Sequence, residues 1–242
     1  MANVLVGATG SVAAVRVPNL FAALTAEGHA VKVVATDAAT YFFDPHSIGK
    51  QDPSPNPLPE TGRGLAHPSL AGKGAGGLGF CFRDSDEWPG DGYKRGDAVL
   101  HIELRKWADL FLIAPLDANT LAKLAVGLCD NCLTCVWRAW DVARPVVLAP
   151  AMNTLMWEHP FTRRHLRSLA ADAGAGHIPG HLEGLPLIAQ INDRSKTLRV
   201  VPPVEKPLAC GDVGMGGLAE IAEIVAAVGE MLNRTPSAAA AL

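Results

Sequence analysis

Residues 3–11, NVLVGATGS, decide the fold of this chain. The apolar residues 3–6 predict a short strand, and the apolar periodicity of residues 12–27 predicts a helix that ends at Gly28. A second apolar strand is predicted at residues 31–35. A strand–turn–helix–strand unit of this length is typical of parallel sheets, so we expect further parallel strands along the chain.

The rest of the chain repeats this alternation. Short, branched, almost wholly apolar runs at residues 109–114 and 145–148 predict strands buried on both faces. Helices are predicted at residues 99–107, 118–140 and 218–232. The predicted fold class is therefore α/β, a doubly wound open parallel sheet in three layers, Rossmann-like or flavodoxin-like. In such sheets ligands bind where the strands end.

Composition predicts one domain over residues 1–233. Residues 49–96 are rich in proline and glycine and predict a loop insertion, because such a stretch cannot sustain a ladder or a helix. A second insertion is expected at residues 180–198. Residues 234–242 are rich in alanine and predict a flexible tail.

Charge and hydropathy exclude several classes of partner. The chain has 242 residues and a net charge of −3, which argues against a nucleic-acid partner and against an electrostatic membrane anchor. No apolar run reaches the roughly 18 residues of a membrane span, and the first predicted strand leaves no room for a leader peptide. We therefore expect a cytoplasmic protein with a small-molecule substrate, no nucleic-acid partner and no membrane partner.

The cysteines at positions 129, 132 and 135 are spaced like ligands of a metal or an iron–sulfur cluster. No second cluster of cysteine or histidine completes a tetrahedral site, so no metal is predicted. The segment also reads as a helix over residues 121–140, whose mostly buried face would carry Leu128, Cys132, Cys135 and Trp137. All five cysteines are expected to be free thiols in a reducing compartment.

Three loops are expected at one edge of the sheet. Gly7-x-x-Gly10-Ser11 follows the first strand, and its glycines and helix-start amides favour an anion, although a tight turn without a ligand explains the pattern equally well. The loops at residues 114–120 and 149–157 each leave a strand through Ala-Pro. Asn119 or Asn153 alone would be a helix cap, but the convergence of three polar loops predicts a pocket.

Five strings occur in an order that resembles one known family: residues 10–14 (GSVAA), 101–104 (HIEL), 118–120 (ANT), 150–157 (PAMNTLMW) and 209–212 (ACGD). They are similar to the homo-oligomeric flavin-containing cysteine decarboxylases, including the plant and yeast halotolerance relatives. The string at residues 150–157 is highly specific, whereas the glycine turn is not.

The resemblance implies FMN as the cofactor. By position, the implied contacts are Gly10, Ser11, Val12, Thr36, Asp37, Ala38, Asp117, Ala118, Asn119, Thr120 and Ala151. Relatives typically carry serine in place of Asp117 and a hydroxyl residue in place of Ala38. A carboxylate near a phosphate is unfavourable unless it points away or has a partner of its own.

The resemblance also implies a reaction, the decarboxylation of phosphopantothenoylcysteine to phosphopantetheine in coenzyme A biosynthesis. In the family mechanism the flavin oxidises the thiol-bearing carbon to a thioaldehyde, CO2 leaves, and the resulting enethiol is reduced again. His101 matches the base, Asn153 the residue that holds the substrate carboxylate, and Cys210 the proton donor. Met156 is expected to line the substrate pocket. Residues 84–88 resemble the stretch before the active-site helix and are expected to be surface structure.

Other readings of the sequence belong to different classes. Fungal relatives act as inhibitory regulatory subunits of a protein phosphatase, but those proteins usually carry long acidic tails, and this chain ends in RTPSAAAAL. The resemblance implies that the glycine-rich loop around Cys210 is a flexible flap over the substrate. Peptide cysteine decarboxylases stop at the enethiol and lack such a flap, and flavin prenyltransferases do not fit the strings around Asn153 and Cys210. The family forms trimers with active sites between subunits, so a homotrimer is expected.

Overall fold

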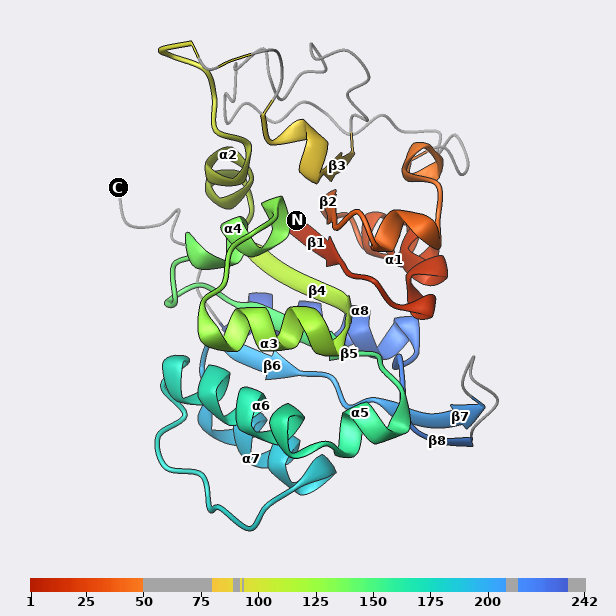
Figure 1. Ribbon diagram of the computed structural model, residues 1–242, viewed down its shortest axis with the longest axis vertical. Coiled ribbons are helices and arrows are strands. Elements are labelled where there is room, and N and C mark those ends of the chain that lie inside the picture. The colour runs from red at the N-terminus through yellow and green to blue at the C-terminus, as the bar shows by residue number, and fades with distance from the viewer. Residues whose placement is uncertain (50–79, 89–91, 93, 208–212, 235–242) are drawn as a thin grey trace.

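The computed structural model has a central sheet of six parallel strands in the order β3-β2-β1-β4-β5-β6 (Figure 1). The structure describes residues 1–49, 80–88, 92, 94–207 and 213–234. The strands are β1 (Asn3–Ala8), β2 (Ala30–Ala35), β3 (Cys81–Arg83), β4 (Leu110–Leu116), β5 (Val146–Pro150) and β6 (Leu198–Val200). This confirms the predicted doubly wound α/β fold.

The central strands form because their residues are apolar without interruption. Every residue of β4 is buried, as are all those of β5, which is typical of parallel strands covered on both faces. Strand order reverses direction between β1 and β4, which pair in parallel. Loops leaving these two strands therefore diverge to opposite sides of the sheet and open a crevice between them.

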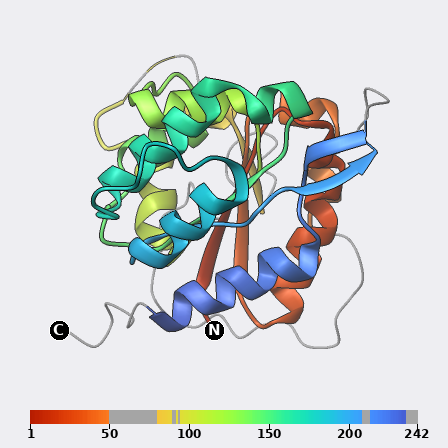
Figure 2. The same cartoon turned by 90° about the horizontal axis from the view of Figure 1, so that it is seen from below.

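Helices cover both faces of the sheet (Figure 2). One apolar cluster packs α1 (Val17–Ala26) and α8 (Ile221–Arg234) on one face. The other cluster holds the remaining large helices on the opposite face. These are α2 (Leu100–Trp107), α3 (Ala118–Val126), α4 (Cys132–Arg138), α6 (Pro160–Asp172) and α7 (Gly184–Arg194), and the short α5 (Thr154–Glu158) precedes α6.

Two predicted helices are each divided in the structure. The helix expected at residues 12–27 begins as a 3₁₀ turn, η1 (Val12–Arg16), and becomes α-helical at Val17, where proline occupies the first turn. The helix expected at residues 118–140 ends at Gly127, which has a φ of 74°. Such a left-handed residue terminates a helix, and the chain restarts α4 at a new cap, Asn131.

The segment at residues 180–198, expected to be an insertion, is mostly helical, and its last residue begins an edge strand. Residues 184–194 form α7, and residues 198–200 form β6, the edge strand beside β5. Periodicity over so short a strand is too weak to read from sequence. Within the stretch 49–96, β3 pairs with β2 and is followed by the 3₁₀ turn η4 (Asp84–Asp86). Most of the remainder, and the tail after Arg234, lie outside the described residues.

An antiparallel hairpin, not foreseen in the sequence, extends from the sheet. It consists of β7 (Val204–Pro207) and β8 (Val213–Gly217), and residues 208–212 between them lie outside the described residues. No described helix is both long and apolar enough to cross a membrane. Over the same described ranges, no group of three or more histidine, cysteine or acidic side chains is arranged to hold a metal ion.

Candidate functional site

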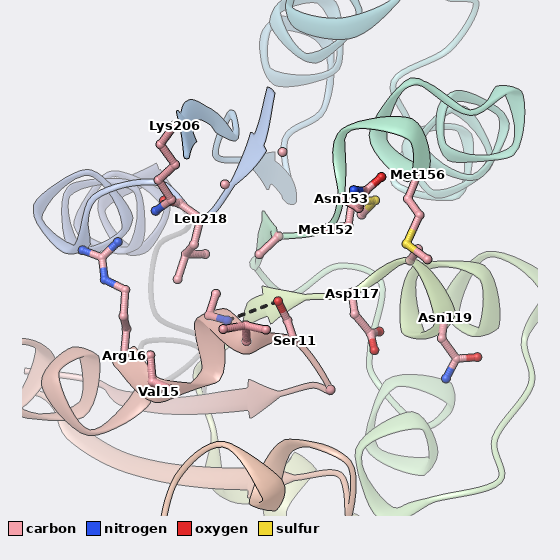
Figure 3. A pocket seen from close by; sticks show the side chains of 17 residues that line it. Ser11, Val15, Arg16, Asp117, Asn119, Met152, Asn153, Met156, Lys206 and Leu218 are labelled. Carbon is pink, nitrogen blue, oxygen red and sulfur yellow. Dashed lines mark hydrogen bonds between the residues drawn. The ribbon is translucent and has the colours of Figure 1, made fainter. Parts of the chain in front are cut away.

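A pocket of about 620 Å³ lies at the carboxyl ends of β1, β4 and β5, in the crevice where the strand order reverses (Figure 3). It brings together nine of the residues predicted for the site. These are Gly10, Ser11, Val12, Asp117, Ala118, Asn119, Ala151, Asn153 and Met156. The three loops that the sequence placed at one sheet edge therefore share a cavity.

Ser11 and Thr9 shape the first of these loops. Ser11 is the N-cap of η1, and its hydroxyl accepts a hydrogen bond from the backbone amide of Ala13 at 3.3 Å. Thr9 is fully buried; its hydroxyl donates to the carbonyl of Pro115 and accepts from the amide of Asp117, both at 2.8 Å. Thr9 thus links the β1 loop to the β4 loop, a role that the glycine pattern around it did not indicate.

Gly10 allows a close approach between the β1 loop and the loop after β2. A Cβ atom at position 10 would lie 2.7 Å from the Cβ atom of Ala38. Contacts that short do not occur between carbon atoms, so this position needs glycine while Ala38 is its neighbour. Ala38, the position at which relatives typically carry a hydroxyl, therefore serves here as a packing surface for the glycine turn.

Asp117, the other departure from the family pattern, caps a helix. It is the N-cap of α3, and its Oδ1 atom accepts a hydrogen bond from the amide of Thr120 at 2.7 Å. Aspartate and serine are both strong N-cap residues, so the replacement keeps this function. The carboxylate has its own partner, which removes part of the objection to a charge at this place.

A smaller polar pocket of about 240 Å³ adjoins the first, because Asp117 and Asn119 line both. It contains the other predicted contacts Thr36, Asp37, Ala38 and Thr120. Its wall also includes Asp84, whose Oδ1 and Oδ2 atoms accept hydrogen bonds from the amides of Cys132 and Asp37. Burial raises the pKa of Asp84 above its usual value, which favours the uncharged form in this acidic pocket.

The loop after β5 forms the opposite wall. Asn153 is the N-cap of α5, and its Oδ1 atom accepts from the amide of Leu155 at 2.9 Å. The amide of Met152 donates to the carbonyl of Gly216 at 2.9 Å, which joins this loop to the hairpin. Gly216 has a φ of 135°, and a Cβ atom there would lie 2.3 Å from the carbonyl oxygen of Met152. Only glycine permits this contact.

Two cations stand across the pocket from Asn153 and Met156 (Figure 3). Lys206 donates from Nζ to the carbonyl of Leu218 at 3.0 Å, and its aliphatic stem lies against Gly217. Arg16 pairs with Glu220 at 2.7 Å, and this contact lowers the pKa of the glutamate. Sequence reasoning missed both cations, because neither lies in a motif and only the folded hairpin brings Lys206 to the pocket.

His101 lies outside both pockets, on the first turn of α2. Figure 1 shows α2 and α5 far apart along the long axis of the molecule. One copy of the chain therefore does not bring His101 to Asn153. The imidazole instead meets Glu87, with 2.5 Å between Nδ1 and Oε1. Glu87 is only 3% exposed, so the expectation that residues 84–88 are surface structure is wrong for this residue.

Cys210, the predicted proton donor, lies outside the described residues, in the connection between β7 and β8. Of the three closely spaced cysteines, Cys132 is buried in α4 while Cys129 is exposed in the loop before it. Of the expected buried face, Cys132, Cys135 and Trp137 lie on α4, whereas Leu128 is exposed outside a helix, because the predicted helix is interrupted at Gly127.

Comparisons with known proteins identify the family of the chain. The family described as Flavoprotein matches residues 1–233. The phosphopantothenoylcysteine decarboxylase of Mus musculus is 41% identical over 233 residues, covering 96% of this chain and 88% of the relative. That of Oryza sativa subsp. japonica is 42% identical over 234 residues, covering 97% and 82%.

Solved structures give the same result. A PPC decarboxylase mutant complexed with pantothenoylaminoethenethiol has a TM-score of 0.69 and 38% identity, covering 96% of this chain and 98% of that one. The FMN binding protein AtHal3 has a TM-score of 0.67 and 38% identity, covering 96% and 97%. Two independent likenesses, of sequence and of fold, therefore extend over nearly the whole chain, and the chain belongs to the phosphopantothenoylcysteine decarboxylase family of flavoproteins.

Proposed function

We propose that this protein decarboxylates phosphopantothenoylcysteine to phosphopantetheine, a step of coenzyme A biosynthesis, with FMN as the cofactor. The observation that carries the proposal is the pocket at the sheet crevice. It unites Ser11, the start of α3 and Asn153, residues that come from three separate loops of the chain. The parallel sheet alone brings the loops to one edge, but a cavity of about 620 Å³ with largely apolar walls is what a small-molecule site requires.

The residues of the pocket fit a flavin. Its walls are largely apolar around Val12, Ala151 and Leu218, as a planar aromatic ring requires. The hydroxyl of Ser11 and the first amides of α3 offer hydrogen bonds and a positive helix end to the polar part of the cofactor. When bound, FMN supplies a two-electron sink and source, without which a simple carboxylate loses CO2 only with great difficulty.

The residues of the chain bind and orient the substrate, and they transfer protons. Asn153 presents an amide beside the cavity, which binds a carboxylate through its N–H groups without adding charge. Its Oδ1 atom is held by the amide of Leu155, which directs the nitrogen away from the helix cap. Met156 closes the apolar side of the pocket. His101 accepts a proton as the thiol is oxidised, and Cys210 returns one to the enethiol.

His101 reaches this site from a second copy of the chain. Val12, Val15, Leu155 and Met156 are each about half exposed or more, and three of them line the pocket. Exposed apolar side chains around a cavity are typical of a surface that another chain covers. A homotrimer with its active sites between subunits explains both this surface and the separation of His101 from Asn153.

One purification tests the proposal. The protein is expected to be yellow, or to become yellow when reconstituted with FMN, and to release CO2 from phosphopantothenoylcysteine. A colourless protein that cannot be reconstituted and releases no CO2 contradicts the enzyme assignment. The phosphatase-subunit alternative then gains weight and is tested by adding the protein to a purified phosphatase.

Variants separate the roles of the proposed proton-transfer residues. Cys210→Ser is expected to release CO2 while the enethiol accumulates, because oxidation and decarboxylation precede the step that needs the thiol. If Cys210→Ser forms the normal product at the full rate, the donor assignment is wrong. His101→Asn is expected to lower CO2 release at least about 100-fold to a small residual rate while FMN stays bound, and full turnover by that variant contradicts its role as the base.

A further inference from the structure

Glu87 is a buried carboxylate that serves a single histidine. Its Oε2 atom accepts a hydrogen bond from the backbone amide of His101 at 3.2 Å, and its Oε1 atom lies 2.5 Å from the Nδ1 atom of the same residue. Among the described residues, the ion pair of Glu87 is with His101 and with no lysine or arginine. Two contacts of the carboxylate are therefore with the same residue, His101.

The start of α2 explains why a carboxylate is needed there. The N-cap position is Val99, which has no side-chain hydrogen bond to offer. The first amides of a helix lack partners within the helix, and the N-terminus favours a negative charge. Glu87, fourteen residues earlier in the chain, supplies the missing acceptor to His101. It therefore fixes the backbone of this residue as well as its ring.

The position of Glu87 is itself fixed from the preceding turn. Asp86 accepts a hydrogen bond from the amide of Arg83 at 2.8 Å, and Asp84 accepts one from the amide of Cys132 at 3.0 Å. These contacts tie η4 to the start of α4, so that the next residue is held against α2. The thiol of Cys132 also contacts Glu87, and burial with this anion nearby raises the pKa of the thiol.

The contact with Glu87 determines which nitrogen of His101 can act as a base. An ionised carboxylate only accepts hydrogen bonds, so the Nδ1 atom must carry the proton. The lone pair of the neutral ring then lies on Nε2, and the side chain is 19% exposed. When Nε2 takes a proton, the resulting cation faces the carboxylate, as in the aspartate–histidine pair of serine proteases.

We propose that Glu87 is the positioning residue of this enzyme, which holds His101 in the tautomer with a proton on Nδ1 and a free Nε2 directed to the substrate site. This inference rests on the proposed function, because it assigns His101 the role of base. It adds the residue that leaves the Nε2 atom of the imidazole able to accept a proton. Glu87 itself touches neither the FMN pocket nor the polar pocket beside it.

The first experiment observes the tautomer directly. The holoenzyme is labelled with ¹⁵N-histidine, and spectra are recorded at a pH where free imidazole is neutral, with His101→Asn identifying the signal. We expect a protonated Nδ1 and an unprotonated Nε2 in the unmodified protein. In Glu87→Ala the proton is expected to move largely to Nε2. If Glu87→Ala does not fold, Glu87→Gln preserves the size and is expected to give a mixture of the two tautomers.

The second experiment uses kinetics. Glu87→Gln is expected to lower kcat by about 100-fold, the order of a general base's contribution, while KM changes by less than about threefold. In a His101→Asn background, Glu87→Gln is expected to cause no further loss, because its effect passes through the imidazole. The matched control is Glu103→Gln, on the same helix, whose carboxylate pairs with Lys106 at 3.1 Å. It is expected to leave tautomer and kcat unchanged.

The outcomes distinguish this inference from the proposed function. If the unmodified protein releases no CO2 while the tautomer depends on Glu87, the proposed function fails and the structural part of the inference stands. If the protein is active but the tautomer is the same in Glu87→Ala or Glu87→Gln as in the unmodified protein, the inference is wrong. Full additivity of Glu87→Gln and His101→Asn overturns it as well.

Discussion

Individual polar residues hold the loops of the pocket together. Thr9 joins the β1 and β4 loops through two hydrogen bonds from one buried hydroxyl. Asp117 and Asn153 cap the helices that follow their strands, and both residues line the cavity. Each of these side chains thus forms hydrogen bonds with backbone groups, and these bonds set the geometry of the loops around the site.

Replacing Thr9 by valine is expected to destabilise the protein by about 2 kcal/mol, because it leaves the carbonyl of Pro115 and the amide of Asp117 buried without partners. Urea unfolding at a fixed protein concentration measures the change. Thr25→Val is the control, since that hydroxyl only donates to the Phe21 carbonyl within α1. Equal stability of the two variants contradicts the bridging role of Thr9.

At the level of elements, two packing contacts have consequences that can be measured: the contact of the β7–β8 hairpin with the β5 loop, and the contact of β2 with α2. The hairpin β7–β8 reaches the pocket because Gly216 lets it lie against Met152. On the other side of the molecule, Lys32 of β2 lies over the ring of Trp107 of α2, with Nζ 4.4 Å from the ring centroid. Both contacts join elements that are distant along the chain.

Gly216→Ala is expected to displace the hairpin from the β5 loop. The new methyl group would overlap the carbonyl oxygen of Met152, so the amide of Met152 loses its partner and the pocket opens. We expect the affinity for FMN to fall at least about tenfold, equivalent to a loss of about 1.4 kcal/mol. Quenching of flavin fluorescence on titration measures this affinity. Gly229→Ala in α8, where nothing lies within 4 Å, is expected to bind FMN normally.

Lys32 gives stability a pH dependence. Burial lowers the pKa of its ammonium group to about 8, whereas the unfolded chain keeps the ordinary lysine value of about 10.4. Between these values the unfolded state binds more protons, so the free energy of unfolding contributed by Lys32 rises with pH. The unmodified protein is therefore expected to gain stability relative to Lys32→Met from pH ~8 to ~10.

Urea midpoints of the two proteins, measured across this pH range, test the sign. The difference between them removes the titration of other groups, including Cys81, whose thiol pKa is raised by burial to about 12. The exposed Lys196 provides the control variant Lys196→Met, for which no such trend is expected. A difference between the unmodified protein and Lys32→Met that stays flat, or falls, contradicts the burial argument.

At the scale of the whole molecule, the residues assigned to the proposed reaction lie at two separate places of one chain. Asn153 and Met156 line the cavity, whereas His101, which contacts Glu87, is on α2. Figure 1 shows α2 far from α5, the helix that Asn153 caps. Copies arranged around a rotation axis can place the second part of one copy against the cavity of the next. In the proposed trimer, the cavity of each copy receives His101 from a neighbouring copy.

Mixed oligomers test this arrangement. His101→Asn and Asn153→Asp are each expected to be nearly inactive alone. When they are folded together in equal amounts, about one quarter of the sites contain both intact residues, because each residue is intact in half of the copies. CO2 release is expected to recover to about that fraction of the unmodified protein. Mixtures made after separate folding, without exchange of subunits, are the control. No recovery in the co-folded sample contradicts a site shared between copies.

The sequence by itself determined the sheet and the edge at which the site lies. The apolar runs at residues 3–6, 31–35, 109–114 and 145–148 are strands because such runs bury both faces. The loops after three of these strands had to meet at one edge once the strands were parallel. Nine of the predicted site residues consequently line one pocket.

Only the tertiary structure decided the remainder. The β7–β8 hairpin, the edge strand β6 and the pair of Glu87 with His101 depend on contacts between segments that local composition does not link. His101 stands apart from Asn153 because α2 packs on α4, whereas α5 packs on α6 and β8 further along the same face of the sheet. The family resemblance nevertheless implies one site for both residues. Local periodicity predicts which face of a segment is buried, but the tertiary structure decides which residues pack against that face.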